Sequence, residues 1–429
     1  MFVKMSNMND LISIEECVEV IRNARTATNA TFKVLNYQVN KIGGQLGYLG
    51  EYAYLVVTIE EEHGQTEDLK YFMKCLPFTD PKQRQIVEEV GMFKKEALTY
   101  RELFSKFNQD ATKVMKWRPS CWLIRDDLLV MEDLTTKGYL AMAYRKDFNK
   151  LHMLKIFESM AQMHACSLDL EFNQMNREKL GSKFEPMLYE TTFMKDSQWF
   201  TVGLMGIMKV ALEGSKYALN ATYKERISSE MIAKMDEIYQ LMEPSDRFQS
   251  VVVHRDLWFN NMMFQFEQHP SKGTIDYDKP TSCTLIDFQI ARYLPPAVDF
   301  WCAIYLLTRR AHRDQYYETY KEYYYQTLGA KLRKLDLDIQ HILPWEQFVE
   351  SLAHYRLVGL LWSGILLGFV NLPEEFLCNL HTNDTKAYYE FCLVNRDEII
   401  MDFFRKDRYY RERLLDTVEE ALEYMFKFQ

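Results

Sequence analysis

A polar run, HRDLWFNN, follows three valines and carries the residues with the clearest chemical roles. It places Asn261 five positions after Asp256. A short loop between two strands would turn both side chains into one cleft, where Asp256 could take the proton of an attacking hydroxyl. The amide of Asn261 could hold a metal ion on phosphate groups. The spacing therefore predicts phosphoryl transfer to a hydroxyl rather than an ordinary polar turn.

A second acidic residue, Asp287, ends the next apolar strand pattern, in Leu285-Ile286-Asp287-Phe288-Gln289. Its place downstream of the polar run, across a short hairpin, predicts a second metal ligand. Gln289 stands where a glycine would provide a flexible hinge. This substitution argues against a segment that flips between two conformations.

Lys74 ends an alternating strand pattern, Tyr71-Phe72-Met73-Lys74, and could neutralise the phosphates of a nucleotide. Its acidic partner is expected on the helix that follows. We choose Glu96 for this role, and Glu88 and Glu89 are the alternatives two turns earlier. An exposed strand lysine and a solvated helix face are the plainer interpretations of the same residues.

The nucleotide itself is expected between a glycine cluster and the end of a later strand. Glycines stand at positions 43, 44, 47 and 50, and we assign Gly47 and Gly50 to the phosphate-binding loop because glycine lets backbone amides approach phosphate. A simple hairpin turn would explain them nearly as well. Glu132 and Leu134 follow a strand, where backbone groups could hold the base.

The elements that must position these residues divide the chain into 1–134 and 135–429. The first part predicts a capped helix after Ser13, an antiparallel sheet and one long helix over Pro81–Gln109. The second part is mainly helical, with one island of short strands around the polar run. The prediction is an α+β fold with a small β-rich N-terminal lobe and a large helical C-terminal lobe.

The expected elements follow from apolar periodicity and from β-branched and aromatic content. Helices are expected over Lys150–Leu170, Lys216–Met242, Val298–Leu328, Pro344–Val370 and Arg408–Phe428. Strands are expected over Thr31–Asn40, Tyr52–Glu60, Leu69–Leu76, Cys121–Ile124, Leu128–Met131, Val251–Val253, Met262–Gln265 and Ser282–Ile286, and a loop over Glu267–Lys279.

Composition narrows the class of protein. The chain has 429 residues and a formal net charge of −9, which argues against nucleic acid as a partner. Its eight cysteines are scattered without a CxxC pair, so we expect free thiols in a reducing cytoplasm. No secretory signal is visible, and the apolar run Leu357–Val370 is shorter than the roughly 20 residues that span a bilayer. We interpret it as a buried helix and expect no membrane partner.

These motifs resemble those of the insect ecdysteroid kinase-like family, which is related to choline and aminoglycoside kinases within the protein kinase-like superfamily. Trp258 and Gln289 are the more specific features. Many relatives carry glycine at the position of Arg255, and phosphate sensing by this arginine is an untested alternative. The resemblance runs from about Tyr48 to the last helix and includes Gly47–Glu51, Tyr71–Pro77, Val130–Leu134, Met163–Ser167, His254–Asn261 and Asp287–Gln289.

The resemblance implies ATP with Mg²⁺ as the donor and a steroid or other lipophilic alcohol as the acceptor. Asp256 would be the base, Asn261 and Asp287 would hold Mg²⁺, and Lys74 paired with Glu96 would neutralise the phosphates. Alternatives are a detoxifying kinase for foreign alcohols, a choline- or aminoglycoside-type kinase, and a pseudokinase that only binds a partner. The oligomeric state is left unassigned.

The segment after Asp287 bears on the acceptor. Pro295-Pro296 and the apolar run Val298–Leu307 follow closely, which leaves no long activation segment on which a polypeptide substrate could bind. Asp299 either braces the catalytic loop or is a helix N-terminal acid favoured by the helix dipole. Aromatic stretches at Tyr316–Tyr325 and Phe300–Tyr305 either line an acceptor pocket or belong to the core.

Overall fold

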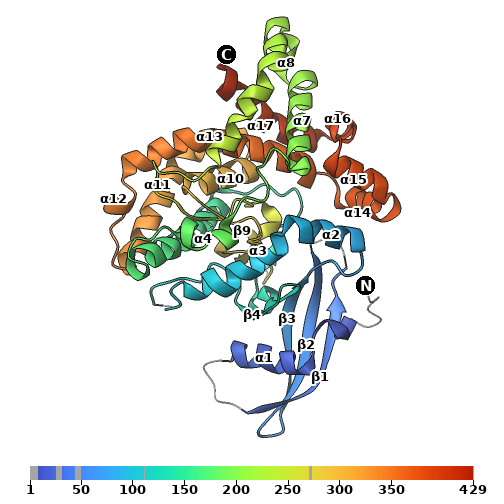
Figure 1. Ribbon diagram of the computed structural model, residues 1–429, viewed down its shortest axis with the longest axis vertical. Helices are drawn as coiled ribbons and strands as arrows, with labels where there is room; N and C mark the ends of the chain where they lie inside the picture. Colours follow the sequence, from blue (N-terminus) through green and yellow to red (C-terminus); the bar gives the residue numbers. More distant parts are fainter. Residues whose placement is uncertain (1–7, 26–30, 44–49, 111, 270–272, 429) are drawn as a thin grey trace.

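The computed structural model describes residues 8–25, 31–43, 50–110, 112–269 and 273–428. It divides into a small part with an antiparallel sheet and a large, mainly helical part. A strand-rich part near the N-terminus lies below a larger, mainly helical part in Figure 1. The expected α+β fold class is confirmed.

The smaller part is built on a five-stranded antiparallel sheet. Its strand order is β1-β2-β3-β5-β4, with bounds β1 Phe32–Lys41, β2 Glu51–Glu61, β3 Thr66–Cys75, β4 Cys121–Ile124 and β5 Leu128–Glu132. Alternate residues of β2, such as Leu55 and Val57, are buried on the face that packs against α1 (Ile14–Ala24). Tyr52 and Lys74 pair across β2 and β3, so both lie on the opposite face, toward the helical part.

The helix α1 begins as its sequence predicts. The backbone N–H of Glu16 donates to Ser13 Oγ at 3.1 Å, and the N–H of Ser13 donates to Glu16 Oε2 at 2.8 Å. This reciprocal capping box satisfies two backbone donors that the first turn of a helix leaves free.

The prediction of a single helix over Pro81–Gln109 is wrong. The segment forms α2 (Pro81–Val90), α3 (Met92–Leu98), a π-helical turn over Thr99–Leu103 and a 3₁₀ turn over Phe104–Lys106. Gly91 separates the first two helices with φ +75, a left-handed conformation that ends a helix and that glycine adopts without a Cβ penalty. The break gives α3 a direction of its own, which brings its acidic residue to the site described below.

The helical part surrounds a continuous apolar core. Two of its expected helices are interrupted: Lys216–Met242 is η6, α8 and α9, and Val298–Leu328 is α10 and α11, separated at Thr308. The helices are α4 Lys150–Asp169, α5 Leu180–Lys183, α6 Glu185–Leu188, α7 Gln198–Glu213, η6 Lys216–Leu219, α8 Ala221–Met235, α9 Glu237–Leu241, α10 Ala297–Leu307, α11 Arg310–Lys334, α12 Ile339–Ile342, α13 Trp345–Val370, α14 Glu374–Asn383, α15 Thr385–Leu393, α16 Asp397–Lys406 and α17 Arg408–Phe426.

The helix α13 contains the apolar run noted in the sequence. Within the described ranges it is the one helix whose length and composition would allow it to cross a membrane, and 83% of its most apolar window is buried inside the structure. Gly359 on α13 lies so close to α10 that an added Cβ would stand 2.5 Å from Trp301 Cβ. The expectation of a buried helix is confirmed.

The island of strands forms two small sheets. β7 (Val251–Val253) pairs with β10 (Arg292–Leu294), and β8 (Met262–Gln268) pairs with β9 (Ile275–Leu285) and β6 (Leu140–Ala141). The loop expected over Glu267–Lys279 is largely wrong, because the β8–β9 ladder continues past two irregularities to the pairs Glu267–Asp276 and Gln268–Ile275. The polar residues there face solvent on a hairpin and mask the strand pattern.

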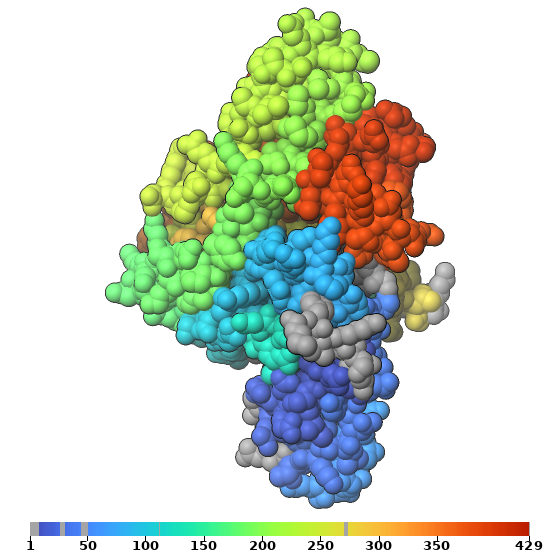
Figure 2. All heavy atoms as spheres, turned by 45° about the vertical axis from the view of Figure 1, so that its right-hand side comes forward, coloured from blue at the N-terminus to red at the C-terminus, as the bar shows by residue number. Residues whose placement is uncertain are grey.

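The two parts also meet beside the sheet. In Figure 2 the surface of α14–α16, in red, lies next to that of α2, in blue. The carboxylate of Asp80, which caps α2, lies 3.3 Å from His381 Nε2, and the ammonium of Lys82 lies 4.0 Å from the centre of the Tyr389 ring. These contacts join the start of α2 to α14 and α15.

Candidate active site

The catalytic-loop residues lie between β7 and β8. Asp256 and Asn261 meet there: the Asn261 amide Nδ2 donates to the backbone oxygen of Asp256 at 2.9 Å and to its Oδ2 at 2.8 Å. The strand β7 ends in the core at Val253, and a short 3₁₀ turn, Phe259–Asn261, returns the chain to β8. The loop therefore holds one carboxylate oxygen of Asp256 in a fixed direction.

Lys74, Glu96 and Asp287 form a second group. Lys74 Nζ lies 2.5 Å from Glu96 Oε2 and 2.9 Å from Asp287 Oδ1, and Glu96 Oε1 accepts the N–H of Phe288 at 3.0 Å. Of the three glutamates considered, the structure brings only Glu96 to the lysine. Glu88 pairs instead with Arg84 on the surface of α2, and Glu89 accepts a hydrogen bond from Gln85.

The residue after Asp287 anchors this group. Phe288 is fully buried, and its ring centre lies 5.0 Å from that of Phe104 and 5.6 Å from that of Trp117. Asp287 itself has the left-handed backbone conformation, with φ +66. It stands between the end of β9 and the buried ring of Phe288, and this conformation sets the direction of its carboxylate. The segment is fixed by packing, in agreement with the absence of a glycine hinge at Gln289.

Burial and charge set the protonation of these groups. Burial alone would lower the pKa of Lys74, but the carboxylates of Asp287 and Glu96 raise it well above its usual value. Burial raises the pKa of Glu96, and Lys74 opposes that shift. A lysine held between two carboxylates stays positively charged at neutral pH, which is what a group that binds phosphate requires.

Asp256 has an unusual environment for a carboxylate. Burial raises its pKa, and the negative charge of Asp287 raises it further, to about 7, against the opposing hydrogen bond from Asn261. Burial also lowers the pKa of His254, whose Nδ1 accepts the N–H of Asp256 at 3.2 Å while its Nε2 donates to the backbone oxygen of Ile286 at 2.9 Å. The neutral histidine thus fixes the backbone of the base.

A buried carboxylate braces the loop from behind. Asp299, at the start of α10, accepts the N–H groups of His254 and Arg255, each at 2.7 Å. Its Oδ2 also lies 3.1 Å from His164 Nε2, and His164 Nδ1 lies 2.7 Å from the Tyr324 hydroxyl. The bracing interpretation of Asp299 is confirmed. His164 lies in the segment Met163–Ser167 and Tyr324 in the aromatic stretch Tyr316–Tyr325, but the sequence did not indicate that either residue supports Asp299.

The side chain of Arg255 faces the interior. It is 0% exposed, its guanidinium contacts Glu190 through two nitrogens at 2.7 and 3.1 Å, and its Nε donates to the backbone oxygen of Ile290 at 2.9 Å. An arginine engaged in this way does not present its charge to a phosphate added at the surface. Phosphate sensing by Arg255 is therefore contradicted, and Glu190 is a residue that no sequence motif had indicated.

The residues expected to hold the nucleotide are brought together only in part. Gly47 lies outside the described residues. Gly50 lies beside Lys74, where an added Cβ would stand 3.6 Å from the lysine Cε and 3.3 Å from the backbone oxygen of Cys75. Leu134 begins a 3₁₀ turn, where the helix itself does not use the backbone N–H.

The contacts of Glu132 involve its backbone and its side chain. Its backbone N–H donates to the oxygen of Ser120 at 2.9 Å. Its carboxylate is held by Lys116 and Lys137, which lowers its pKa although burial alone would raise it. The side chain of Glu132 is therefore a structural ion pair.

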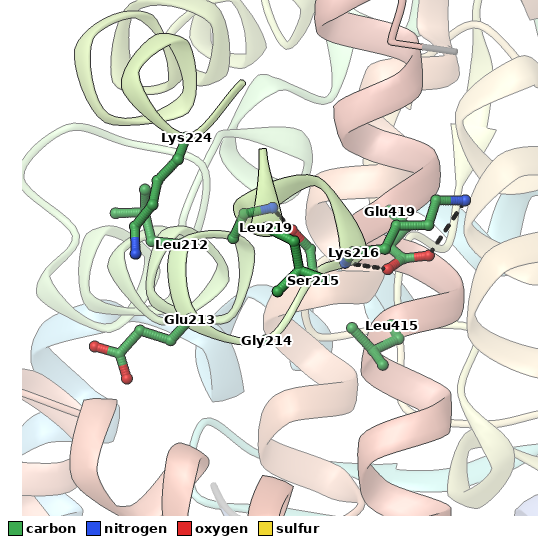
Figure 3. A pocket seen from close by; sticks show the side chains of 10 residues that line it. Leu212, Glu213, Gly214, Ser215, Lys216, Leu219, Lys224, Leu415 and Glu419 are labelled. Carbon is green, nitrogen blue, oxygen red and sulfur yellow. Dashed lines mark hydrogen bonds and ion pairs between the residues drawn. The ribbon is translucent and has the colours of Figure 1, made fainter. Parts of the chain in front are cut away.

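The aromatic stretch Phe300–Tyr305 belongs to the core. All six residues are buried, and the Phe300 ring stacks on that of Phe157 with 5.2 Å between centres. The interpretation of this stretch as a pocket wall is wrong. A surface pocket of about 600 Å³ does lie between α7 and α17, but it contains none of the expected site residues (Figure 3). Its lining includes Glu213, Lys216, Leu219, Lys224, Leu415 and Glu419.

The donor set of the site suits magnesium. The carboxylate of Asp287, with 18% of its side chain exposed, and the amide oxygen of Asn261 are the hard oxygen ligands that Mg²⁺ prefers. Across the described ranges there is no cluster of three or more His, Cys, Asp or Glu side chains that could hold a metal without other ligands. Two protein ligands are enough where nucleotide phosphates and water complete the shell.

The sequence profile of the ecdysteroid kinase-like family matches residues 47–337. The fold is similar to an ethanolamine kinase of Plasmodium vivax, with 11% identity, 94% of this chain and 86% of that chain covered, and a TM-score of 0.40. It is also similar to the streptomycin–ATP–APH(2″)-IIa ternary complex, with 14% identity, 89% and 99% covered, and a TM-score of 0.34. No curated protein sequence matches the chain.

Proposed function

The chain belongs to the ecdysteroid kinase-like family and is a small-molecule kinase, and from that premise we propose that it transfers the terminal phosphoryl group of ATP to a hydroxyl of an ecdysteroid or another lipophilic alcohol. One observation carries the proposal. Residues from distant parts of the chain meet in two contacts. The cation of Lys74 lies 2.9 Å from the proposed metal-binding carboxylate of Asp287, and the amide of Asn261 lies 2.8 Å from the proposed base, Asp256.

In the proposed mechanism each residue has a defined task, and Asn261 has two. Asp256 orients the acceptor hydroxyl and takes its proton, and Asn261 holds the Asp256 carboxylate in place. Lys74, fixed by Glu96, neutralises nucleotide phosphates. Asn261 and Asp287 would hold Mg²⁺, which when bound supplies positive charge beside the phosphates. Phosphoryl transfer depends mainly on positioning and electrostatics, so these groups are sufficient.

The two parts of the chain divide this work. We propose that residues 1–134 form the nucleotide-binding lobe, with Gly47, Gly50 and Leu134 near the nucleotide, and that residues 135–429 carry the base and the acceptor site. A cytoplasmic location is part of the same proposal, because ATP and reducing conditions are found there.

The direct test is ATP consumption by the purified protein with Mg²⁺ against a panel of alcohols. The panel contains ecdysone, 20-hydroxyecdysone, other sterols, phenols, choline and aminoglycosides, and mass spectrometry identifies the products. A phosphorylated sterol that disappears in Asp256→Asn supports the proposal. Phosphorylated choline or aminoglycoside alone would move the acceptor to another class, and no product together with no ATP binding would indicate a pseudokinase.

The pH dependence of the reaction follows from the raised pKa of Asp256. The base acts only as a carboxylate, so kcat/KM is expected to rise tenfold per pH unit below about pH 7 and to level off above it. Burial and the charge of Asp287 raise this pKa, and Asn261, Trp258 and Arg255 lower it. The measurement is kcat/KM for the best acceptor between pH 5 and 9.

The same profile has a control and a contradicting outcome. Stability must be followed by thermal unfolding at each pH, so that loss of folded protein is not counted as loss of the base. A profile that stays flat down to pH 5 in folded enzyme would show that Asp256 does not accept the proton in the rate-determining step.

A further inference from the structure

The segment between α6 and α7 contains a glutamate, Glu190, whose carboxylate is largely buried instead of exposed to solvent. Glu190 is 15% exposed, and its Oε1 accepts the N–H groups of Thr191, Thr192 and Phe193 at 3.0, 2.9 and 3.1 Å. Its other contacts are cations: Arg255 in a two-point pair, and Arg292 Nη1 at 3.5 Å. The short segment therefore folds around one negative charge.

The carboxylate of Glu190 contacts the catalytic loop through one residue, Arg255. Arg255 directly precedes Asp256 and has φ +67, a conformation that costs a residue with a side chain roughly 1 kcal/mol or more. The backbone of Arg255 is held by Asp299 and by the Trp362 indole, which donates to its oxygen at 2.8 Å. The guanidinium needs a partner of its own, because an unpaired buried cation is strongly unfavourable.

The same segment also reaches the helix that carries Glu96. Lys95 on α3 is 0% exposed and donates to the backbone oxygen of Tyr189 at 2.6 Å. Burial lowers its pKa well below the usual value, and Arg255 lowers it further. Tyr189, next to Glu190, thus accepts a hydrogen bond from Lys95, next to Glu96. The segment between α6 and α7 therefore contacts both the catalytic loop and the helix that carries Glu96.

Glu190 is negatively charged at neutral pH. Burial would raise its pKa, but Arg255 lowers it to about 2. In kinases controlled by an activation loop, the charge that orders the catalytic machinery is added by phosphorylation and is read by arginine. Here an arginine beside the base already has a permanent carboxylate as its partner.

We propose that Glu190 is a positioning residue, which holds the catalytic loop through Arg255 and α3 through the Tyr189–Lys95 contact, and that this built-in charge makes covalent activation unnecessary. The inference rests on the proposed function, because it assigns Glu190 a task in the same reaction. Glu190 touches neither the base nor any group that would bind the nucleotide, so it acts only through its neighbours.

The test compares three variants with the wild type. Glu190→Gln keeps the shape and removes the charge. The double variant Glu190→Gln with Arg255→Gly removes the unpaired cation as well, and glycine adopts φ +67 freely while Asp299 and Trp362 still hold the backbone of residue 255. Glu185→Gln is the matched control, an exposed glutamate in α6, just before this segment.

Glu190→Gln is expected to lower kcat for 20-hydroxyecdysone by about 10- to 100-fold, since small misplacements of a catalytic group have effects of this size. The KM for ATP is expected to stay within about twofold, because Lys74 and Asp287 keep their contacts. The double variant should recover a large part of kcat.

Hydrogen exchange of the amides in 254–261 provides a readout that needs no acceptor. Faster exchange in Glu190→Gln than in Glu185→Gln supports the proposal even if no panel alcohol is phosphorylated, in which case the proposed function fails separately. Wild-type kcat and exchange in Glu190→Gln would overturn the positioning role. Loss of wild-type activity after phosphatase treatment would overturn the claim that no covalent activation is needed.

Discussion

Asp256→Asn is expected to lower kcat by about 10²- to 10⁴-fold, the usual contribution of a positioned general base. Asparagine has the same shape and can still accept the hydrogen bond from Asn261, but it cannot take a proton. ATP binding should change little, because Lys74, Glu96 and Asp287 are untouched. Single-turnover product formation and ATP affinity, measured side by side, separate the two effects.

The same variant is expected to be more stable than the wild type above pH 7. A carboxyl whose pKa is raised by folding, here to about 7, binds its proton more tightly in the folded protein. Ionisation therefore penalises the folded state above pH 7, and the penalty fades as the pH falls toward 4. Thermal unfolding should show a larger gain for Asp256→Asn at pH 8 than at pH 5. Near-normal turnover in this variant would refute the base assignment.

Asp287→Asn is expected to lower kcat by about 10²- to 10³-fold and to weaken ATP binding in the presence of Mg²⁺, because a charge that acts on the transferring group is removed. Lys74 also loses one of the two carboxylates that raise its pKa. Two measurements are needed: kcat as a function of Mg²⁺ concentration, and ATP affinity with and without Mg²⁺. A shift of the Mg²⁺ dependence to higher concentration is the specific sign of a lost ligand.

A pH profile distinguishes this variant from Asp256→Asn. The negative charge of Asp287 helps to raise the pKa of Asp256, so kcat/KM in Asp287→Asn should level off at a lower pH than in the wild type. Asp278→Asn, on the exposed side of the β8–β9 hairpin, is the matched control. Unchanged Mg²⁺-dependent ATP affinity in Asp287→Asn would refute the metal assignment.

Local patterns predicted most elements of the fold. The capping box at Ser13 and Glu16, the alternation in β2 and the strand β7 were visible because each depends on residues close in sequence. The points at which expected helices are interrupted could not be predicted from the sequence. Gly91 could have ended a helix or have been tolerated within one, and its φ of +75 is set by packing beside Tyr189 from the other part of the chain.

In the site, too, residues placed by local sequence could be predicted, whereas residues placed by contacts between distant segments could not. Asp256, Asn261 and Asp287 could be identified because their spacing is fixed by a loop and a hairpin, and Lys74 because it ends a patterned strand. Glu190 could not, since it lies 65 residues from Arg255 and belongs to no motif. His164 stands on a helix of otherwise ordinary core residues, and only the fold brings it to Asp299. Contacts between distant segments leave no periodic signal in the sequence.

The left-handed backbone at Arg255 has an evolutionary consequence. At φ +67 a glycine needs neither a side-chain partner nor any strain energy, whereas an arginine needs a carboxylate within reach. Selection should therefore retain the acid at position 190 in lineages with arginine at position 255 and relax it in lineages with glycine there. The two positions should covary in an alignment of related sequences, and the order in which the two substitutions arose would be constrained, with the acid fixed before the arginine.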